Sequence, residues 1–114
     1  MSSFFRSLSL FTAKEIEQFF RSVTLTHKSS DLKFMFAPAQ KPMGRILLVV
    51  PKYFGNAPKR NKLKRRLKTV FILNKLFEHK FDVSIKPVKP NNINYAEIET
   101  QIQAAYDKLL ANNT

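Results

Sequence analysis

The chain has 114 residues, of which 44% are hydrophobic, and its formal net charge is +12. This length fits one domain over residues 1–114, and the hydrophobic fraction excludes a globally disordered chain. The absence of Cys excludes a disulfide scaffold and a thiolate site, and with no long apolar run or signal peptide the sequence predicts a soluble cytoplasmic protein without membrane contact.

The first predicted helix covers residues 13–22, and residues 1–11 before it are expected to be a flexible N-terminal extension. Thr12 and Glu15 have the spacing of a capping box at the start of this helix. Hydrophobic residues then recur at helical spacing, namely Ile16, Phe19, Phe20 and Val23. Val23 and Leu25 open a short strand.

Two further strands are predicted on either side of a connection over residues 38–44. Residues 32–36 alternate as a strand does, with three hydrophobic side chains on one face: Leu32, Phe34 and Phe36. Residues 45–50, an Arg followed by a continuous apolar run, are typical of a central strand.

The second predicted helix opens at residues 55–58, where Pro58 suits the first turn. A stripe for the core follows at Leu63, Leu67, Val70 and Phe71. Residues 81–85 alternate as a last strand, and Asn94 with Glu97 is expected to cap a final helix. Its buried side is predicted to carry Tyr95, Ile98, Ile102, Ala105, Tyr106 and Leu109. The order α-β-β-β-α-β-α predicts a single-domain α+β sandwich.

The positive charge is concentrated in the middle of the chain. Residues 32–77 contain twelve Lys or Arg and no Asp or Glu, whereas the rest of the chain holds eight of each sign. The excess peaks over residues 59–68, where seven of ten residues are basic. A helix face that serves solubility alone carries interspersed acids, so this pattern favours a nucleic-acid partner.

The basic stretch also carries a motif. Residues 55–68 resemble the signature of the bacterial ribonuclease P protein family, in which a Gly-Asn-Ala loop precedes an Arg-Asn-Arg helix start and a Lys-Arg pair. Here Gly55 begins the loop, Arg60, Asn61 and Lys62 occupy the Arg-Asn-Arg positions, and Lys64 and Arg65 form the pair. The predicted element order matches the fold of this family, which resembles the ribosomal protein S5 domain 2-like fold.

Several positions depart from the family pattern. The Ser-Lys-Lys turn of the family appears as Pro51, Lys52 and Tyr53, and Lys stands at 62 and 68 where the family has Arg. Lys keeps the charge but loses the bidentate fork of Arg, so contacts at these two positions are expected to be less specific. The Arg-Leu pair before the first helix is replaced by Ser9 and Leu10.

The resemblance implies a non-catalytic protein subunit. In this family the RNA subunit, with Mg²⁺, removes the 5′ leader of precursor tRNA endonucleolytically, and the protein docks on the ribonuclease P RNA and holds the leader. The protein itself is expected to bind no metal or cofactor and no DNA. The expected contacts to the RNA subunit are Lys52, Asn56, Lys59, Arg60, Asn61, Lys62, Lys64, Arg65, Arg66 and Lys68. For Asn61 the alternative is a local bond to the first turn of its helix.

A cleft for the leader is expected between the first helix and the second strand, because bases stack on aromatic faces with little sequence preference. The candidate residues are Ile16, Phe20, Leu32, Phe34 and Phe36. Each of them taken singly fits a core position better, and adjacent Phe19 and Phe20 cannot both face the core.

Two other functions remain open. A generic basic RNA-binding protein, such as a ribosomal protein or an assembly factor, would carry the same basic helix. A protein enzyme that cleaves RNA alone would need acid and base groups, and His27 and His79 stand without a partner at ligand or relay spacing.

Overall fold

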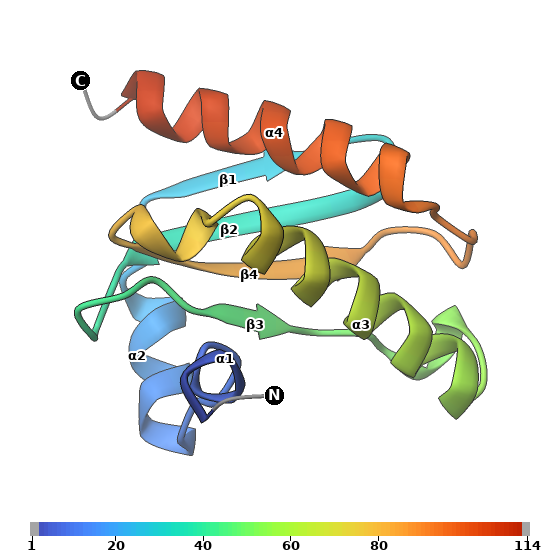
Figure 1. Cartoon of the computed structure of the whole chain (residues 1–114), viewed down its shortest axis with the longest axis horizontal. Coiled ribbons are helices and arrows are strands. Elements are labelled where there is room, and N and C mark those ends of the chain that lie inside the picture. Colours follow the sequence, from blue (N-terminus) through green and yellow to red (C-terminus); the bar gives the residue numbers. More distant parts are fainter. Residues whose placement is uncertain (1–2, 113–114) are drawn as a thin grey trace.

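The computed structural model describes residues 3–112, and it forms a four-stranded sheet with helices on both faces (Figure 1). The helices and strands follow in chain order: α1 Ser3–Ser7, α2 Ala13–Arg21, β1 Leu25–Lys28, β2 Leu32–Pro38, β3 Ile46–Leu48, η1 Lys52–Phe54, α3 Ala57–Leu73, η2 Leu76–Glu78, β4 Phe81–Pro87 and α4 Tyr95–Asn112. From α2 onward, the longer elements confirm the predicted order α-β-β-β-α-β-α.

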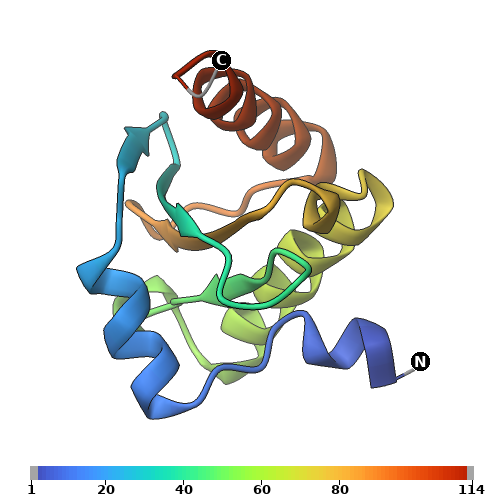
Figure 2. The same cartoon turned by 90° about the vertical axis from the view of Figure 1, so that its left-hand side faces the viewer.

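The strand order is β1-β2-β4-β3. Strand β2 pairs antiparallel with both β1 and β4, and β3 pairs parallel with β4. A parallel pair needs a crossover, and α3 supplies it between β3 and β4. Helices α3 and α4 cover one face of the sheet, and α2 lies on the other (Figure 2).

The main hydrophobic core lies between the sheet and the helices α3 and α4. Strand β2 sends Leu32, Phe34 and Phe36 into it, and all three are fully buried. The rings of Phe36 and Tyr106 meet edge to face, with centroids 5.1 Å apart. The prediction that these three residues of β2 line a leader cleft is therefore wrong, because the hydrophobic face of the strand is the one that the helices cover.

The segment before α2 is packed where the sequence predicted a flexible extension. Leu8 is only 2% exposed and belongs to the main core. The Ile46 nitrogen donates to the Leu8 carbonyl oxygen at 2.8 Å, so this segment runs along the outer edge of β3. Of the residues expected to be flexible, positions 1–2 lie outside the described part of the chain.

The predicted boundaries differ most at β3, where pairing with β4 covers three residues instead of six. The Val49 nitrogen still donates to Ile85 oxygen, and Pro51 then leads into the single turn η1. Gly44 is required just before the strand, since a Cβ there would lie 2.3 Å from the Phe81 carbonyl oxygen. Within residues 3–112, no helix combines the length and apolar character that a bilayer span needs.

Candidate RNA interface

The turn η1 and the loop over residues 55–56 lie directly before helix α3 and set its orientation. Gly55 has φ +152°, a conformation that residues with a side chain rarely adopt. The side chain of Asn56 then caps the helix by accepting from the Lys59 nitrogen at 3.1 Å. The Asn56 oxygen is therefore committed to the helix end, and Lys52 lies exposed in the turn η1 beside it.

Seven basic side chains project from α3 around its buried stripe. The stripe consists of Leu63, Leu67, Val70 and Phe71, as predicted. Within the described residues, no basic side chain of α3 forms an ion pair with an acid. A row of unpaired cations on one helix creates a strong positive potential and attracts a polyanion. The basic residues are Lys59, Arg60, Lys62, Lys64, Arg65, Arg66 and Lys68.

Two of these cations also have a structural contact. The Arg66 Nη1 donates to the Ile93 carbonyl oxygen at 2.7 Å, and the Lys68 Nζ donates to Ser9 Oγ at 3.0 Å. Partial burial, together with the charge of Arg6, lowers the pKa of Lys68. The side chain of Asn61 is exposed and makes no hydrogen bond to another described residue, so the alternative local bond is absent.

The strand pairing builds a second basic feature on the sheet face opposite the main core. Lys28 of β1 pairs with Lys33 of β2, which in turn pairs with Lys86 of β4. Side chains that pair directly across strands point to the same face, so the three lysines form one row across the sheet. Like charges in such positions destabilise a sheet, and a bound anion would relieve this repulsion. We call Lys28, Lys33 and Lys86 the lysine row.

Helix α2 lies on this same face of the sheet. Its Phe19 is fully buried, and its Phe20 is 45% exposed with its ring perpendicular to that of Phe19. Ile16 is half-buried. The expectation that only one of the two Phe rings faces the protein interior is confirmed, and the exposed ring is Phe20. The β2 residue between Phe34 and Phe36 on this face is Met35.

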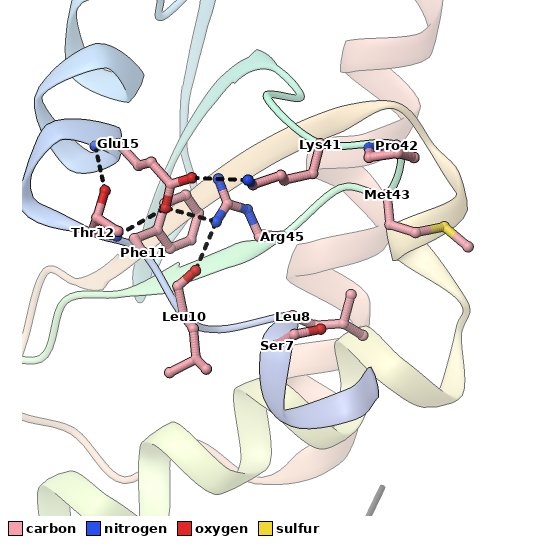
Figure 3. A pocket seen from close by; sticks show the side chains of 10 residues that line it. All are labelled: Ser7, Leu8, Leu10, Phe11, Thr12, Glu15, Lys41, Pro42, Met43 and Arg45. Carbon is pink, nitrogen blue, oxygen red and sulfur yellow. Dashed lines mark hydrogen bonds and ion pairs between the residues drawn. The ribbon is translucent and has the colours of Figure 1, made fainter. Parts of the chain in front are cut away.

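A buried arginine fixes α2 to the sheet (Figure 3). The Arg45 Nη1 donates to the Leu10 carbonyl oxygen at 2.7 Å and to Glu15 Oε1 at 3.1 Å, and the guanidinium carbon lies 4.0 Å from the centroid of the Phe11 ring. The backbone nitrogen of Arg45 donates to Asp82 Oδ1 at 2.8 Å. Sequence reasoning missed this arginine, since a single Arg before an apolar run carries no recognisable pattern.

The same cluster borders a cavity of about 580 Å³ between the segment before α2 and the loop over residues 41–43. The hydrogen bond from the Thr12 nitrogen, followed by that from Arg45, lowers the pKa of Glu15 to about 2. Burial raises the pKa of Asp82, although two backbone N–H groups and Arg45 oppose this shift. Glu15 thus holds Arg45 and the start of α2 together, and Asp82 accepts from the backbone nitrogens of Gln40 and Arg45.

Chemistry-bearing groups are sparse elsewhere in the described residues. No three His, Asp or Glu side chains among them come together as a metal-binding group. His27 packs near Phe34, with ring centroids 6.0 Å apart, and His79 packs near Tyr106, with ring centroids 5.6 Å apart.

The structure brings together, on η1 and α3, the residues from Lys52 to Lys68 that were predicted to contact the RNA subunit. It separates Ile16 and Phe20 from the buried residues of β2.

Comparison with known proteins gives a consistent picture. The family model described as Ribonuclease P matches residues 4–110. No curated protein sequence gives a significant match.

Solved structures of RNase P proteins share the fold. The RNase P protein from Thermotoga maritima is 21% identical, with a TM-score of 0.73 over 85% of this chain and 93% of that one. The same protein in complex with 1-(4-fluorophenyl)-2-thiourea is 22% identical, with a TM-score of 0.72 over 84% and 94%. The RNase P protein from Staphylococcus aureus is 15% identical, with a TM-score of 0.76 over 90% and 94%.

Proposed function

Because the chain belongs to the ribonuclease P protein family, we propose that its helix α3 docks on ribonuclease P RNA while the opposite sheet face holds the 5′ leader of precursor tRNA. Family membership makes the chain the protein subunit of a tRNA-processing ribonucleoprotein, and it implies an RNA partner. We propose in addition that this RNA is ribonuclease P RNA, that the protein contacts the leader of precursor tRNA, and that the RNA carries out the cleavage.

The observation that carries the proposal is the unpaired basic face of α3. Phosphates of a structured RNA would replace the missing acid partners, and each contact would release condensed counterions. The guanidinium groups of Arg60 and Arg65 can each donate two parallel hydrogen bonds to a phosphate. The ammonium groups of Lys62 and Lys64 attract phosphate as point charges. Asn61, which has both a donor and an acceptor free, lies among these cations and suits a sugar or base edge.

The lysine row and Phe20 support the second contact. An extended single strand needs cations that follow its backbone and an exposed ring on which bases stack. The lysine row supplies the first, and Phe20 supplies the second on the same side of the sheet. Because α3 lies on the opposite face, the protein has room for two RNA segments at the same time (Figure 2).

We assign the cleavage chemistry to the RNA subunit and its Mg²⁺ ions, and we place the holoenzyme in the cytoplasm. The two acids at the Arg45 cluster, Glu15 and Asp82, are engaged by Arg45 and by backbone N–H groups. The contribution of the protein is then to position the RNA subunit and the leader, which lowers the entropy lost when enzyme and substrate combine.

A binding experiment separates this function from its rivals. Equilibrium titration should compare a bacterial ribonuclease P RNA with an unrelated structured RNA of equal length, at the same salt concentration. The proposal predicts clearly tighter binding to the ribonuclease P RNA. Equal affinity for both would identify a generic RNA-binding protein. Cleavage of precursor tRNA by the purified protein alone would identify a protein enzyme.

A further inference from the structure

Tyr95, the first residue of α4, is 49% exposed, although the helical pattern predicted it on the buried side of that helix. The prediction is wrong because the core contacts of α4 begin one turn later, at Ile98. A large aromatic side chain therefore lies open at the surface, next to α3 and outside the predicted RNA contacts.

A cavity of about 500 Å³ lies between α3 and the start of α4, with Tyr95 in its wall. This volume falls in the range of pockets that hold small ligands. Four of its seven lining residues are basic, and none is acidic. The lining residues are Lys62, Arg65, Arg66, Lys68, Thr69, Ile72 and Tyr95.

Arg66 fixes the geometry of this site. Its Nη1 donates to the carbonyl oxygen of Ile93, which is itself buried, and its guanidinium carbon lies 5.5 Å from the centroid of the Tyr95 ring. The guanidinium is therefore held in place beside the ring before any ligand binds. A preorganised cation and ring cost little conformational entropy when they take up a flat, electron-rich ligand.

We propose that this cavity binds an unpaired nucleotide of the RNA, with its base stacked on Tyr95 and its phosphates held by Lys62 and Arg65. The inference rests on the proposed docking of α3 and extends the RNA surface from α3 onto α4. A base fits the aromatic wall, and the adjoining phosphates fit the cations. A lipid headgroup would use the cations but would leave the exposed ring without a flat partner.

The chain contains no Trp, so Tyr95→Trp introduces a single fluorescent reporter that can itself stack on a base. The experiment titrates this full-length variant with a bacterial ribonuclease P RNA, and it determines the affinity independently by filter binding. Stacking predicts quenched emission at saturation and an affinity close to that of the wild type. Leu110→Trp, at an exposed position near the other end of α4, is the matched control and should show no quenching.

Two further variants test the ring itself. Tyr95→Ala should weaken binding by about tenfold, and Tyr95→Phe should bind as the wild type does. The slope of log K against log salt should not change in either variant, because no phosphate contact is lost. Unchanged Tyr95→Trp emission at saturating RNA would overturn the inference but leave the docking of α3 intact. Failure of the wild-type protein to bind this RNA would instead overturn the proposed function.

Discussion

The guanidinium of Arg45 and the carboxylate of Glu15 lie 3.1 Å apart, and this pair joins helix α2 to the residue that directly precedes β3. Arg45 is 5% exposed, so its charge is almost fully removed from water. Such a burial is tolerated only where partners offset its cost. Here Nη1 donates to Glu15 and to the Leu10 carbonyl oxygen, and the Asp82 carboxylate lies 4.0 Å from Nη2, whereas Nε and Nη2 have no hydrogen-bond partner among the described residues. The pair thereby holds α2, with its exposed Phe20, against the face that carries the lysine row.

Arg45→Met should destabilise the protein strongly. The substitution leaves the buried carboxylate of Asp82 without its cation, which costs about 3 kcal/mol in comparable buried pairs. The free energy of unfolding from urea titration measures the loss. Arg21→Ala is the matched control, because it removes an exposed Arg–Glu pair within α2 and should cost at most about 0.5 kcal/mol. Equal losses in the two variants would show that Arg45 has no special role.

The stability should depend on pH through Glu15. Its pKa is lowered to about 2 in the folded protein from an ordinary 4.5, so its stabilising contribution is complete above pH 4.5 and is lost as the pH falls toward 2. Glu15→Gln should be less stable than the wild type at pH 6, and the difference should shrink as the pH falls from 4.5 to 2. Urea titrations of both proteins across this range measure it. A difference that stays constant with pH would contradict the assignment.

Much of the fold could be predicted from the sequence because it rests on local periodicity. The stripe from Leu63 to Phe71 and the capping box at Thr12 are confirmed. Alternation in β2 showed correctly that Leu32, Phe34 and Phe36 share a face, but alternation alone does not say which face the helices cover. That choice depends on packing between distant elements, and it led to the wrong placement of the leader cleft.

The lysine row could not be predicted at all. Lys86 is 53 residues from Lys33, and only the strand register brings them together. Leu8 was missed for a similar reason, since its alternation with Ser spans only residues 7–10 and does not distinguish buried Leu8 from exposed Leu10. The basic cluster on α3 was found because its residues are contiguous in sequence.

The double variant Arg60→Ala with Arg65→Ala should weaken binding to the RNA subunit and flatten its salt dependence. Two lost phosphate contacts reduce the slope of log K against log salt by about 1.8. Titrations at several salt concentrations measure this slope. Lys108→Ala, on the exposed side of α4, is the control and should leave the slope unchanged. An unchanged slope in the double variant would exclude α3 as the docking helix.

Lys33→Ala should weaken binding of precursor tRNA to the holoenzyme and leave binding of mature tRNA unchanged. One lost contact to a single strand reduces the salt slope for the precursor by about 0.7. The same substitution removes like-charge repulsion from the middle of the lysine row, so the protein should not lose stability. Equal weakening for precursor and mature tRNA would remove the lysine row from the leader site.

Phe20→Ala and Phe34→Ala should have opposite signatures. Phe34 is fully buried, so its truncation should cost about 3–5 kcal/mol of stability. Phe20 is exposed, so its truncation should leave stability nearly unchanged and raise the KM for precursors with long leaders. Thermal unfolding and steady-state kinetics measure the two effects. An unaltered KM for Phe20→Ala would mean that this ring does not contact the leader.

The most direct test of the whole account is cleavage of precursor tRNA at low Mg²⁺ by a bacterial ribonuclease P RNA, with and without this protein. The account predicts cleavage at the 5′ leader junction that is strongly stimulated only when both components are present. Tight binding of the RNA subunit with no stimulation of cleavage would contradict it.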